Sequence, residues 1–568
     1  MAKNERPPPR IPNPMPARPA SAIAAKFERA LALHRQGNLA QAEWLYRQVI
    51  DREPGHVDAL HLLGVIAYQR GRFDDAARLI GRALALKPDF VQALFHRGTT
   101  LMALRRPEEA LASFDKALAL KPDFPEALCQ RGHALMALQR LDAALLSFER
   151  ALAIRPDFAE ALNGRGNALL EAKRPDDALA SFDRALENDP NYVAALNNRG
   201  NALLELRRLD DAVASWDRAV ALRPDYFQAL TNRGNALAEW RRVDEALASY
   251  ARALEIKPDD ADAHWHESLC HLLAGDFSRG WEKYEWRWRR QSLPVPPRDF
   301  TQKLWLGAQD LAGKTLLLHA EQGFGDTIQF CRYATLAAER GARVVLEVQG
   351  ALKALMSGLD GVERVVARGE TLPPFDLHCP LMSLPLAFKT TLTTVPARVP
   401  YLKPAPHLVE KWRQRLGEHR APRIGLVWFG SSGHQNDRNR SIALSRLAPF
   451  LDNGATLVSL QNSLRDEDRQ GFDSHKIHHF GSELRDFADT AALTSLIDSV
   501  ISVDTAVAHL AGALGKRIFI LLPFIASDWR WLTDRDDSPW YPTARVYRQS
   551  AIDDWESVLE RVARELPR

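Results

Sequence analysis

Prolines recur through the first half of the chain at a constant spacing of 34 residues. The series comprises Pro54, Pro88, Pro122, Pro156, Pro190, Pro224 and Pro258. Glycines keep the same period from Gly64 to Gly234. A fixed period of this length is typical of repeat architectures, in which each unit buries its apolar face against its neighbours. Apolar and small residues recur at helical spacing within each unit, and the proline ends the second helix because it has no N–H to donate.

The repeating unit resembles the tetratricopeptide repeat family. Segments such as ALASFDKALALKPDF and ALASFDRALENDPNY stand at the same phase of the repeat. Extended over residues 22–293, this phase predicts about eight helix pairs, in which Ala30 and Ser268 replace the glycine of the first and last units. The resemblance implies a right-handed α-solenoid. The repeat glycine is expected to let the two helices of a pair approach closely.

Polar residues occupy two positions in the first helix of most repeats, two residues before and one residue after the glycine. Positions three apart lie on one helix face, so stacked repeats would align these side chains. The asparagines of this strip are Asn167, Asn198, Asn201, Asn232 and Asn235. The resemblance places the strip on the concave surface, where asparagine ladders of the tetratricopeptide-fused O-linked N-acetylglucosamine transferases clamp extended peptides. We therefore expect a protein or peptide acceptor to bind here; a solvated surface or a simple spacer is the alternative.

The composition is that of an ordinary globular protein. The 568 residues are 46% hydrophobic and 26% charged, and the length predicts several folding units. A net charge of +3 does not suggest a nucleic-acid binder. The longest apolar run, residues 518–526, contains Pro523 and is far shorter than the ~20 residues of a membrane-spanning helix. No transmembrane segment is expected.

The N-terminal residues and the cysteines indicate the compartment. Residues 1–21 are rich in proline and lack the apolar core of a secretion signal, so we expect a disordered lead-in. Cys129, Cys270, Cys331 and Cys379 are widely separated, and this spacing argues against a zinc site and a disulfide framework. These features favour a cytoplasmic protein.

Short strand-like runs alternate with helical segments after a proline-rich connector near residue 294. The predicted strands are 315–320, 343–348 and 363–366, followed by 423–428, 455–460, 499–502 and 517–522. This alternation predicts two doubly wound α/β modules with parallel sheets, over 294–405 and 406–568. Two consecutive Rossmann-like modules suggest a cleft between them, as in the GT-B architecture of glycosyltransferases.

The segment HAEQGFGDTIQF runs from the first of these strands into a helix and contains Gly323, Gly325 and Asp326. A carboxylate at the carboxyl end of a strand lies where doubly wound sheets place ligand groups, although Asp326 could also be a helix N-cap. The segment resembles the Gly-Asp turn of heptosyltransferase-like GT-B enzymes (glycosyltransferase family 9-like). The resemblance implies that Asp326 is the general base that deprotonates an acceptor hydroxyl, and that Gly323 and Gly325 contribute to donor binding.

The segment SVISVDTAVAHLAGALG contains a strand, a turn and a helix start, with Asp504 and Thr505 at the turn. Free N–H groups at the start of a helix bind phosphate well. The segment resembles the Asp-Ser/Thr-Gly-x-x-His-x-Ala signature with which heptosyltransferase-like enzymes bind the donor, and departs from it at Ala506. The resemblance implies that Asp504, Thr505, Ala506 and His509 bind the donor; a capping Asp504 and a core His509 are the alternatives.

Three further residues near the strands of the second module are candidates for donor binding. Ser431 lies in a glycine-serine turn, and Arg440 suits the charge of a pyrophosphate, although it could be a surface residue. Gln461 follows the strand 455–460, where a base or ribose could be contacted. The aromatic residues near the C-terminus are expected to pack the module rather than to stack on sugars.

The combination predicts a cytoplasmic, inverting GT-B glycosyltransferase that transfers a sugar from a nucleotide-sugar donor to a Ser or Thr hydroxyl of a protein acceptor. No cofactor is expected, because the nucleotide sugar is a co-substrate. No metal is expected, because GT-B enzymes stabilise the leaving phosphate with helix dipoles and side chains. The layout resembles bacterial tetratricopeptide-fused glycosyltransferases, including those that modify flagellin. A heptosyltransferase-like enzyme of surface glycan synthesis and a non-catalytic scaffold are the alternatives, and the donor, acceptor, linkage and oligomeric state stay open.

Overall fold

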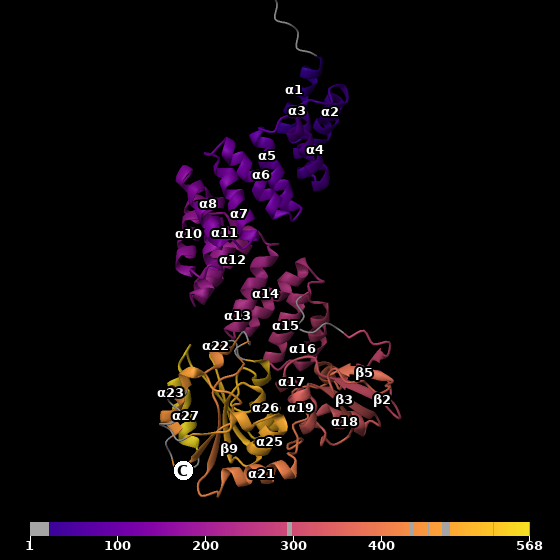
Figure 1. The fold of residues 1–568 in the computed structure, drawn as a ribbon, viewed down its shortest axis with the longest axis vertical. Helices are drawn as coiled ribbons and strands as arrows, with labels where there is room; N and C mark the ends of the chain where they lie inside the picture. The colour runs from indigo at the N-terminus through magenta and orange to yellow at the C-terminus, as the bar shows by residue number, and fades with distance from the viewer. Residues whose placement is uncertain are drawn as a thin grey trace, which may run out of the picture. The chain divides into compact units, whose positions relative to one another are not determined.

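The computed structural model describes residues 22–291, 298–431, 433, 436–451, 454–468, 477–525 and 528–566. The predicted lead-in at 1–21 and the predicted module boundary at 294 lie outside the described residues. Two compact units make up the chain, the first ending at Pro224 and the second beginning at Asp225. Each unit is described by itself below, with its elements labelled as in Figure 1.

The repeats form eight antiparallel helix pairs, as the proline period predicts. Pairs α1–α12 belong to the first unit and α13–α16 to the second. The helices are α1 (Ala22–Arg35), α2 (Leu39–Arg52), α3 (Val57–Gln69), α4 (Phe73–Leu86), α5 (Val91–Ala103), α6 (Pro107–Leu120), α7 (Pro125–Ala137), α8 (Leu141–Ile154), α9 (Ala159–Glu171), α10 (Pro175–Asn188), α11 (Val193–Glu205), α12 (Leu209–Leu222), α13 (Phe227–Glu239), α14 (Val243–Ile256), α15 (Ala261–Leu273) and α16 (Phe277–Tyr284). Every second helix from α2 to α14 ends two residues before a repeat proline.

The repeat glycines confirm their predicted role in helix packing. A Cβ added to Gly98 would lie 2.4 Å from Cε1 of the buried Phe114, which is too close for any side chain. The glycines of the next four repeats face aromatic side chains in the same way, in the pairs Gly132–Phe148, Gly166–Phe182, Gly200–Trp216 and Gly234–Tyr250. The small residue on one helix thus makes room for the large residue on its partner.

After α16, the second unit contains two parallel sheets with helices between their strands. The first has the order β1-β5-β2-β3-β4, with β1 (Lys303–Leu304), β2 (Thr315–His319), β3 (Arg343–Val348), β4 (Val362–Ala367) and β5 (Leu377–Pro380). The second has the order β11-β10-β9-β6-β7-β8, with β6 (Arg423–Val427), β7 (Thr456–Ser459), β8 (His478–His479), β9 (Ser499–Val503), β10 (Arg517–Leu522) and β11 (Ala544–Arg548). All pairings between these strands are parallel.

Helices alternate with these strands, as expected for doubly wound sheets. They are α17 (Phe324–Phe330), α18 (Tyr333–Glu339), α19 (Gly350–Met356), α20 (Leu384–Ala387), α21 (Pro406–Leu416), α22 (Asp437–Arg440), α23 (Leu444–Leu447), α25 (Phe487–Ser495), α26 (Ala506–Ala513) and α27 (Trp555–Glu565). The seven predicted strands correspond to β2, β3, β4, β6, β7, β9 and β10. Strands β1, β5, β8 and β11 were not predicted.

The last repeat packs against the sheet region through aromatic side chains. The Phe277 ring lies 5.8 Å from that of Trp540, and the Trp281 ring lies 5.1 Å from that of Trp529. All four side chains are buried, which agrees with the predicted packing role of the C-terminal aromatic residues. Helix α16 is therefore part of the core of the second unit.

Candidate functional site

The second sheet has the strand order of a dinucleotide-binding Rossmann fold. Read from β8 to β11, its order is 3-2-1-4-5-6 in the sequence of its own strands. The order reverses between β6 and β9, whose ends lie side by side because Val427 pairs with Ser502. Ligands of such sheets bind beyond the carboxyl ends of the strands at this switch point. The loops that follow β6 and β9 therefore form the candidate ligand site, and they carry most of the predicted donor-binding residues.

Arg440 joins these two loops. Its Nη1 donates to the backbone oxygen of Asp504 at 2.7 Å, although the two residues are far apart in sequence. The side chain is 10% exposed, and Gly430 leaves room for it, since a Cβ there would lie 2.2 Å from Arg440 Nη2. Its Nε is buried and makes no hydrogen bond within the described residues, but it lies 3.5 Å from Asp437 Oδ1, with which it forms an ion pair. Arg440 is thus a buried cation at the switch point and not a surface residue.

Ser431 and Gln461 flank the same loop in different ways. Ser431 is exposed and lies a few residues beyond the end of β6. Gln461 is buried, and its Oε1 accepts hydrogen bonds from the backbone N–H groups of Trp428 and Phe429 at 3.0 and 3.2 Å. Gln461 therefore stabilises the loop after β6, and its amide oxygen already accepts two hydrogen bonds.

Helix α26 begins at Ala506 directly after the turn at the end of β9. Thr505 is its N-cap residue in an extended conformation, and its hydroxyl lies 3.2 Å from Ser502 Oγ. Within the described residues, the Thr505 side chain makes no capping bond to the first turn. Ala508 N–H already donates to the Thr505 backbone oxygen at 3.0 Å, so the N–H groups that could receive an anion here are those of Ala506 and Val507.

Asp504 and His509 lie beside each other at this turn, with 3.9 Å between Asp504 Oδ1 and His509 Nε2. Burial, and then the charge of Asp528, raise the pKa of Asp504 to about 7. Burial lowers the pKa of His509 to about 3, so its imidazole is neutral. His509 is buried, its Nδ1 lies 3.0 Å from the hydroxyl of Tyr541, and its Cδ2–Nε2 edge faces the turn.

Asp326 lies at the start of helix α17, after β2 of the first sheet. Its Oδ2 accepts a hydrogen bond from the backbone N–H of Gly323 at 2.8 Å, which is the capping contact considered from the sequence. Its Oδ1 accepts from Arg530 of the other sheet module. The side chain is 21% exposed, and burial raises its pKa although the Arg530 charge opposes this. Capping thus uses one carboxylate oxygen, and the other faces the second module.

The two predicted motifs meet in the structure. A Cβ added to Gly325 would lie 2.8 Å from His509 Cδ2 and 3.5 Å from the Cα of Ala506, so only glycine allows this approach of α17 to α26. Residues predicted from two separate stretches of sequence therefore line one region between the carboxyl ends of the two sheets.

Arg530 and Asp528 complete this region, and sequence reasoning missed both. Arg530 is 7% exposed and donates to Gln329 Oε1 at 2.6 Å, to both carboxylate oxygens of Asp528 at 3.0 Å, and to Asp326. Asp528 and Arg530 stand beside tryptophans that were assigned a packing role from the sequence. The two charged residues were therefore not considered as part of a site. An arginine within a buried aromatic segment is the signal that could have revealed the site, because a buried charge needs a partner.

The predicted asparagine strip can be followed within each unit. In the first unit, Asn198 Nδ2 donates to Asn163 Oδ1 at 3.0 Å, and Asn167, Asn198 and Asn201 are all partly exposed. In the second unit, Asn235 is exposed and accepts from the Tyr250 hydroxyl at 2.6 Å, while Asn232 is partly exposed. The amides on successive repeats are thus accessible, and some of them bond to neighbouring side chains.

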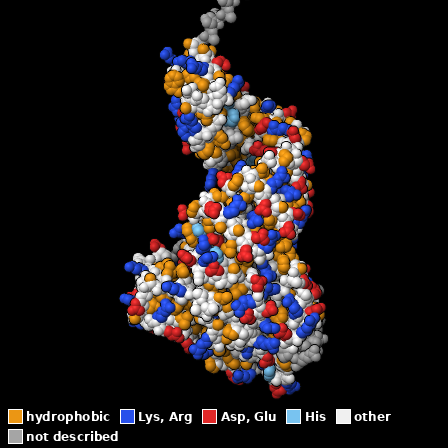
Figure 2. Space-filling view, turned by 180° about the vertical axis from the view of Figure 1, so that it is seen from behind, with side chains coloured by type: hydrophobic (Ala, Val, Ile, Leu, Met, Phe, Trp, Pro, Cys, Tyr) orange, Lys and Arg blue, Asp and Glu red, His pale blue; other side chains and the backbone are white. Residues whose placement is uncertain are grey.

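The surface of both units carries charges of both signs. Figure 2 shows Lys and Arg side chains interspersed with Asp and Glu side chains over the face that it displays. This mixture agrees with the small net charge of +3 and gives no extended basic surface on that face. Among the described helices, none is long and apolar enough to cross a membrane.

A model of the tetratricopeptide repeat family matches residues 27–79, 61–125, 129–193, 197–261 and 241–284. The N-terminal half of the chain therefore consists of tetratricopeptide repeats, which supports a role in protein interaction. Among curated proteins, the chain is 28% identical over 319 residues to Protein FlbA of Caulobacter vibrioides, a match over 51% of this chain and 52% of the relative. The matching region thus spans about half the length of that relative.

Solved structures of repeat proteins also resemble the chain. A tetratricopeptide repeat protein from Parabacteroides merdae matches with 18% identity and a TM-score of 0.39 over 44% of this chain and 99% of that chain. MamA matches with 25% identity and a TM-score of 0.27 over 28% and 95% of the two chains. YrrB, described as a TPR protein with an unusual peptide-binding site, matches with 22% identity and a TM-score of 0.28 over 33% and 95%.

Proposed function

We propose that the second unit is a glycosyltransferase of GT-B type, and that the repeats recruit its protein acceptor. The observation that carries this proposal is the meeting of Asp326, Arg530 and Arg440 at the start of helix α26, with a Rossmann-type switch point beneath them. A base, two cations and free helix N–H groups are what transfer from a nucleotide sugar requires.

The donor phosphates would bind at the start of α26. The first N–H groups of the helix and its dipole attract negative charge, and the Thr505 hydroxyl adds a donor. Arg440 holds the backbone oxygen of Asp504 with Nη1, while its buried Nε makes no hydrogen bond among the described residues and has only the longer ion-pair contact with Asp437 Oδ1 at 3.5 Å. A phosphate oxygen would satisfy this Nε, because charge-assisted hydrogen bonds between arginine and phosphate are strong.

The transfer step needs a base for the acceptor hydroxyl. Asp326 Oδ1 would take the hydroxyl proton while the acceptor oxygen forms a bond to the anomeric carbon and the bond from that carbon to the phosphate oxygen breaks. Arg530 pairs with Asp326 and Asp528, and the diphosphate that leaves would offer it a third anion. Because Arg530 is shared by Asp326 and Asp528, it would balance the charge of the leaving group as Asp326 becomes neutral.

The acceptor is proposed to be a protein with a reactive Ser or Thr hydroxyl. Tetratricopeptide repeats bind proteins, and the accessible amides of Asn167, Asn198 and Asn201 can donate to and accept from an extended backbone. Replacing Asn198 and Asn201 by alanine should then weaken acceptor binding while leaving donor binding unchanged. Equal acceptor affinity in the variant would reduce the strip to solvated surface.

Calorimetric titration of the full chain with a panel of nucleotide sugars tests the donor site. We expect one nucleotide sugar to bind, with Arg440→Ala weakening its binding at least about tenfold through the lost charge-assisted contact. Arg438→Ala is the matched control, because Arg438 lies in the same short helix and is exposed. A protein that binds no nucleotide sugar would leave only the interaction role of the repeats.

Mass spectrometry then distinguishes the acceptor classes. Protein glycosylation predicts that a deletion strain loses sugar from a protein, with flagellin as the first one to inspect. A heptosyltransferase-like activity would instead remove sugar from the lipopolysaccharide core or another surface glycan. Each outcome names a different acceptor.

A further inference from the structure

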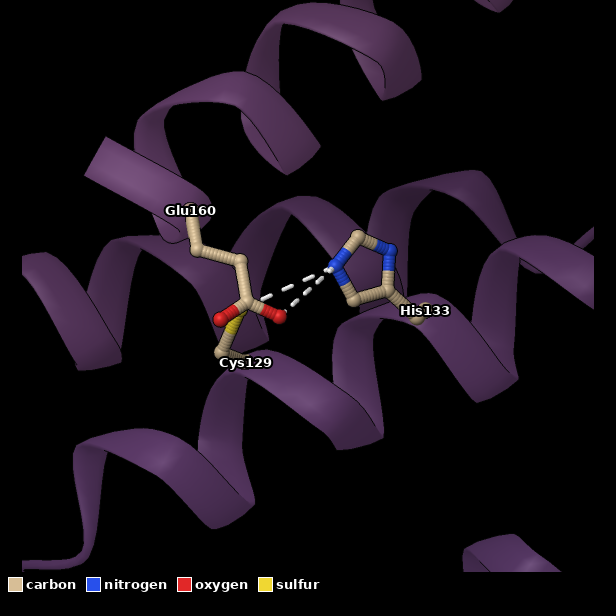
Figure 3. A group of neighbouring side chains, drawn as sticks. All are labelled: Cys129, His133 and Glu160. Carbon is tan, nitrogen blue, oxygen red and sulfur yellow. Dashed lines mark hydrogen bonds and ion pairs between the residues drawn. The ribbon is translucent and has the colours of Figure 1, made fainter. Parts of the chain in front are cut away.

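Three potential metal ligands come together in the first unit, outside the site described above. Cys129 and His133 lie one turn apart on α7, and Glu160 lies on α9 of the following repeat. One ligand atom from each residue lies within 4.8 Å of the other two. Figure 3 shows the imidazole of His133 turned toward the carboxylate of Glu160, with the Cys129 side chain beside them.

The distances are close to those of a coordination sphere. Cys129 Sγ lies 3.7 Å from His133 Nε2, and His133 Nε2 lies 4.0 Å from Glu160 Oε1. A tetrahedral zinc ion with its usual bond lengths holds its ligand atoms roughly 3.3–3.7 Å apart. The three ligand atoms lie within 4.8 Å of one another, so they would have to move closer together to surround an ion.

Metal binding would change the protonation of the buried Cys129 thiol. Zinc takes cysteine as the thiolate, so binding would break the Sγ–H bond, form a metal–sulfur bond and release the proton to solvent.

The repeat sequence departs from its own pattern beside the cluster. The position two residues before the repeat glycine carries Gln130 and Asn198 in two other repeats, but Gly164 in the repeat of Glu160. A Cβ at Gly164 would lie 2.5 and 2.7 Å from Cε1 and Cζ of Phe148, and 3.1 Å from His133 Cε1. The glycine therefore makes room first for the Phe148 ring, and it also leaves space for the imidazole of His133.

The side chains around the cluster are compatible with a bound cation. Gln130 Nε2 donates to Glu160 Oε1 at 2.8 Å and orients the carboxylate. Arg155 is the nearby cation, and its charge is paired with Glu126 at 2.9 Å. The side chains of His133 and Glu160 are 30% and 45% exposed, which leaves a route for an ion and for a water as fourth ligand.

We propose that Cys129, His133 and Glu160 bind a divalent transition-metal ion, with zinc as the preferred ion. Sulfur, imidazole nitrogen and carboxylate oxygen are the ligand atoms that zinc takes in proteins. Three protein ligands and one water form a four-coordinate arrangement that is known for zinc. The bound ion links α7 to α9 and so clamps two neighbouring repeats. The sequence argument against zinc considered pairs of cysteines alone and overlooked a ligand from the next repeat.

Metal titration of the full chain tests this site. Metal-stripped protein is titrated with Zn²⁺ alone in competition with a chromogenic chelator, and with Co²⁺ alone, whose absorption reports a bond to sulfur. We expect one ion per chain, a sulfur-to-cobalt charge-transfer band, and a higher Tm in the presence of Zn²⁺ because the ion binds the folded state. Uptake should release a proton, so affinity should rise with pH.

Three variants and a control decide the outcome. Cys129→Ser, His133→Asn and Glu160→Gln should each weaken Zn²⁺ binding more than about tenfold, and Cys129→Ser should abolish the charge-transfer band. Cys270→Ser, at another buried cysteine, should bind like the unaltered chain. His133→Asn installs the residue that later repeats carry at this position, so folding should survive, with circular dichroism as the check. A chain that takes up no Zn²⁺, or a folded His133→Asn variant that binds it as well as before, overturns the proposal.

Discussion

The repeats and the sheet region differ in how far apart in sequence their contacting residues lie. In the repeats, Asn198 bonds to Asn163, which is 35 residues away, and Arg199 bonds to Ser215, which is 16 residues away. In the sheet region, Arg530 reaches Asp326 across 204 residues. Contacts within one or two repeats leave a visible period in the sequence, whereas a site that joins distant loops leaves none. The same chain is thus easy to interpret in one half and hard in the other.

The division between the two regions does not follow the repeat pattern. The last two helix pairs carry the repeat proline at Pro258 but belong with the sheets. Arg241 of this segment donates to the backbone oxygen of Thr533, and Phe277 and Trp281 are buried among the C-terminal tryptophans. Sequence similarity between repeats therefore does not show which repeats fold together.

Two truncations should separate the regions most sharply. Removing residues 22–224 should leave a folded second unit, because that cut lies between the compact units. Removing residues 22–293 also takes Phe277, Trp281 and Tyr284 out of the core, at about 2–3 kcal/mol for each side chain. We expect this longer deletion to unfold or aggregate, as measured by circular dichroism and thermal melting. Equal Tm values for the two truncations would show that the last repeats are dispensable.

Most of the fold could be predicted from the sequence because it depends on local patterns. The repeat helices follow from periodicity, and seven strands follow from short apolar runs. Strand β5 (Leu-His-Cys-Pro) and strand β11 in the aromatic segment were missed because their sequences lack such a run. The unpredicted strands β8 and β11 extend the second sheet to the full Rossmann order, which the sequence alone did not reveal.

The candidate site could be predicted only in parts. Asp326 and Asp504 follow strands in recognisable motifs, so each was found from its own segment. Arg530 was missed because nothing near it in sequence indicates that its partners are Gln329 and Asp326. Its role follows from tertiary packing, in which a buried guanidinium must find carboxylates.

Asp326→Asn should have the next largest effect and should be confined to the sheet region. The amide keeps the size and the contact with Gly323 N–H but cannot accept a proton, so the rate of sugar transfer should fall by ~10²–10⁴. Donor affinity and acceptor binding to the repeats should change little. Asp299→Asn, an exposed aspartate of the same module, serves as the control. Full activity in Asp326→Asn would remove this residue from the reaction.

The carboxyl groups of Asp504 and Asp528 should change the free energy of unfolding in opposite directions as the pH rises. Burial raises the pKa of Asp504 to about 7, so the folded state holds a proton that the unfolded chain has lost, and stability falls as pH rises from about 4 to 7. Burial alone would raise the pKa of Asp528, but the charge and hydrogen bonds of Arg530 lower it, so this residue stabilises the fold above its unfolded pKa and less in acid.

Asp504→Asn should therefore raise the free energy of unfolding at pH 8 by roughly 1–3 kcal/mol and change it little at pH 4. Asp528→Asn should lower it at pH 8, with a smaller loss at pH 4. Urea unfolding of both variants at the two pH values measures these differences. Two variants that shift stability in the same direction at pH 8 would contradict the assigned charge states.

The smallest expected effect concerns the turn inside each repeat, where a left-handed residue recurs with the same period. Gly37, Gly71 and Gly275 occupy it in three repeats, and Arg105, Gln139, Lys173, Arg207 and Arg241 occupy it in the others with φ between 57° and 62°. A non-glycine residue in this conformation costs roughly 1–2 kcal/mol, whereas glycine adopts it freely but loses more chain entropy on folding.

Gly71→Ala should thus destabilise the chain by about 1 kcal/mol through the backbone alone, because its Cβ would meet no atom within 4 Å. Lys173→Gly, at an exposed side chain, should stabilise it by up to about 1 kcal/mol, and thermal melting of the pair measures both. If Lys173→Gly instead lowers the Tm, the lysine side chain contributes more to its repeat than the backbone conformation costs, and the repeats would then be less uniform than their 34-residue period indicates.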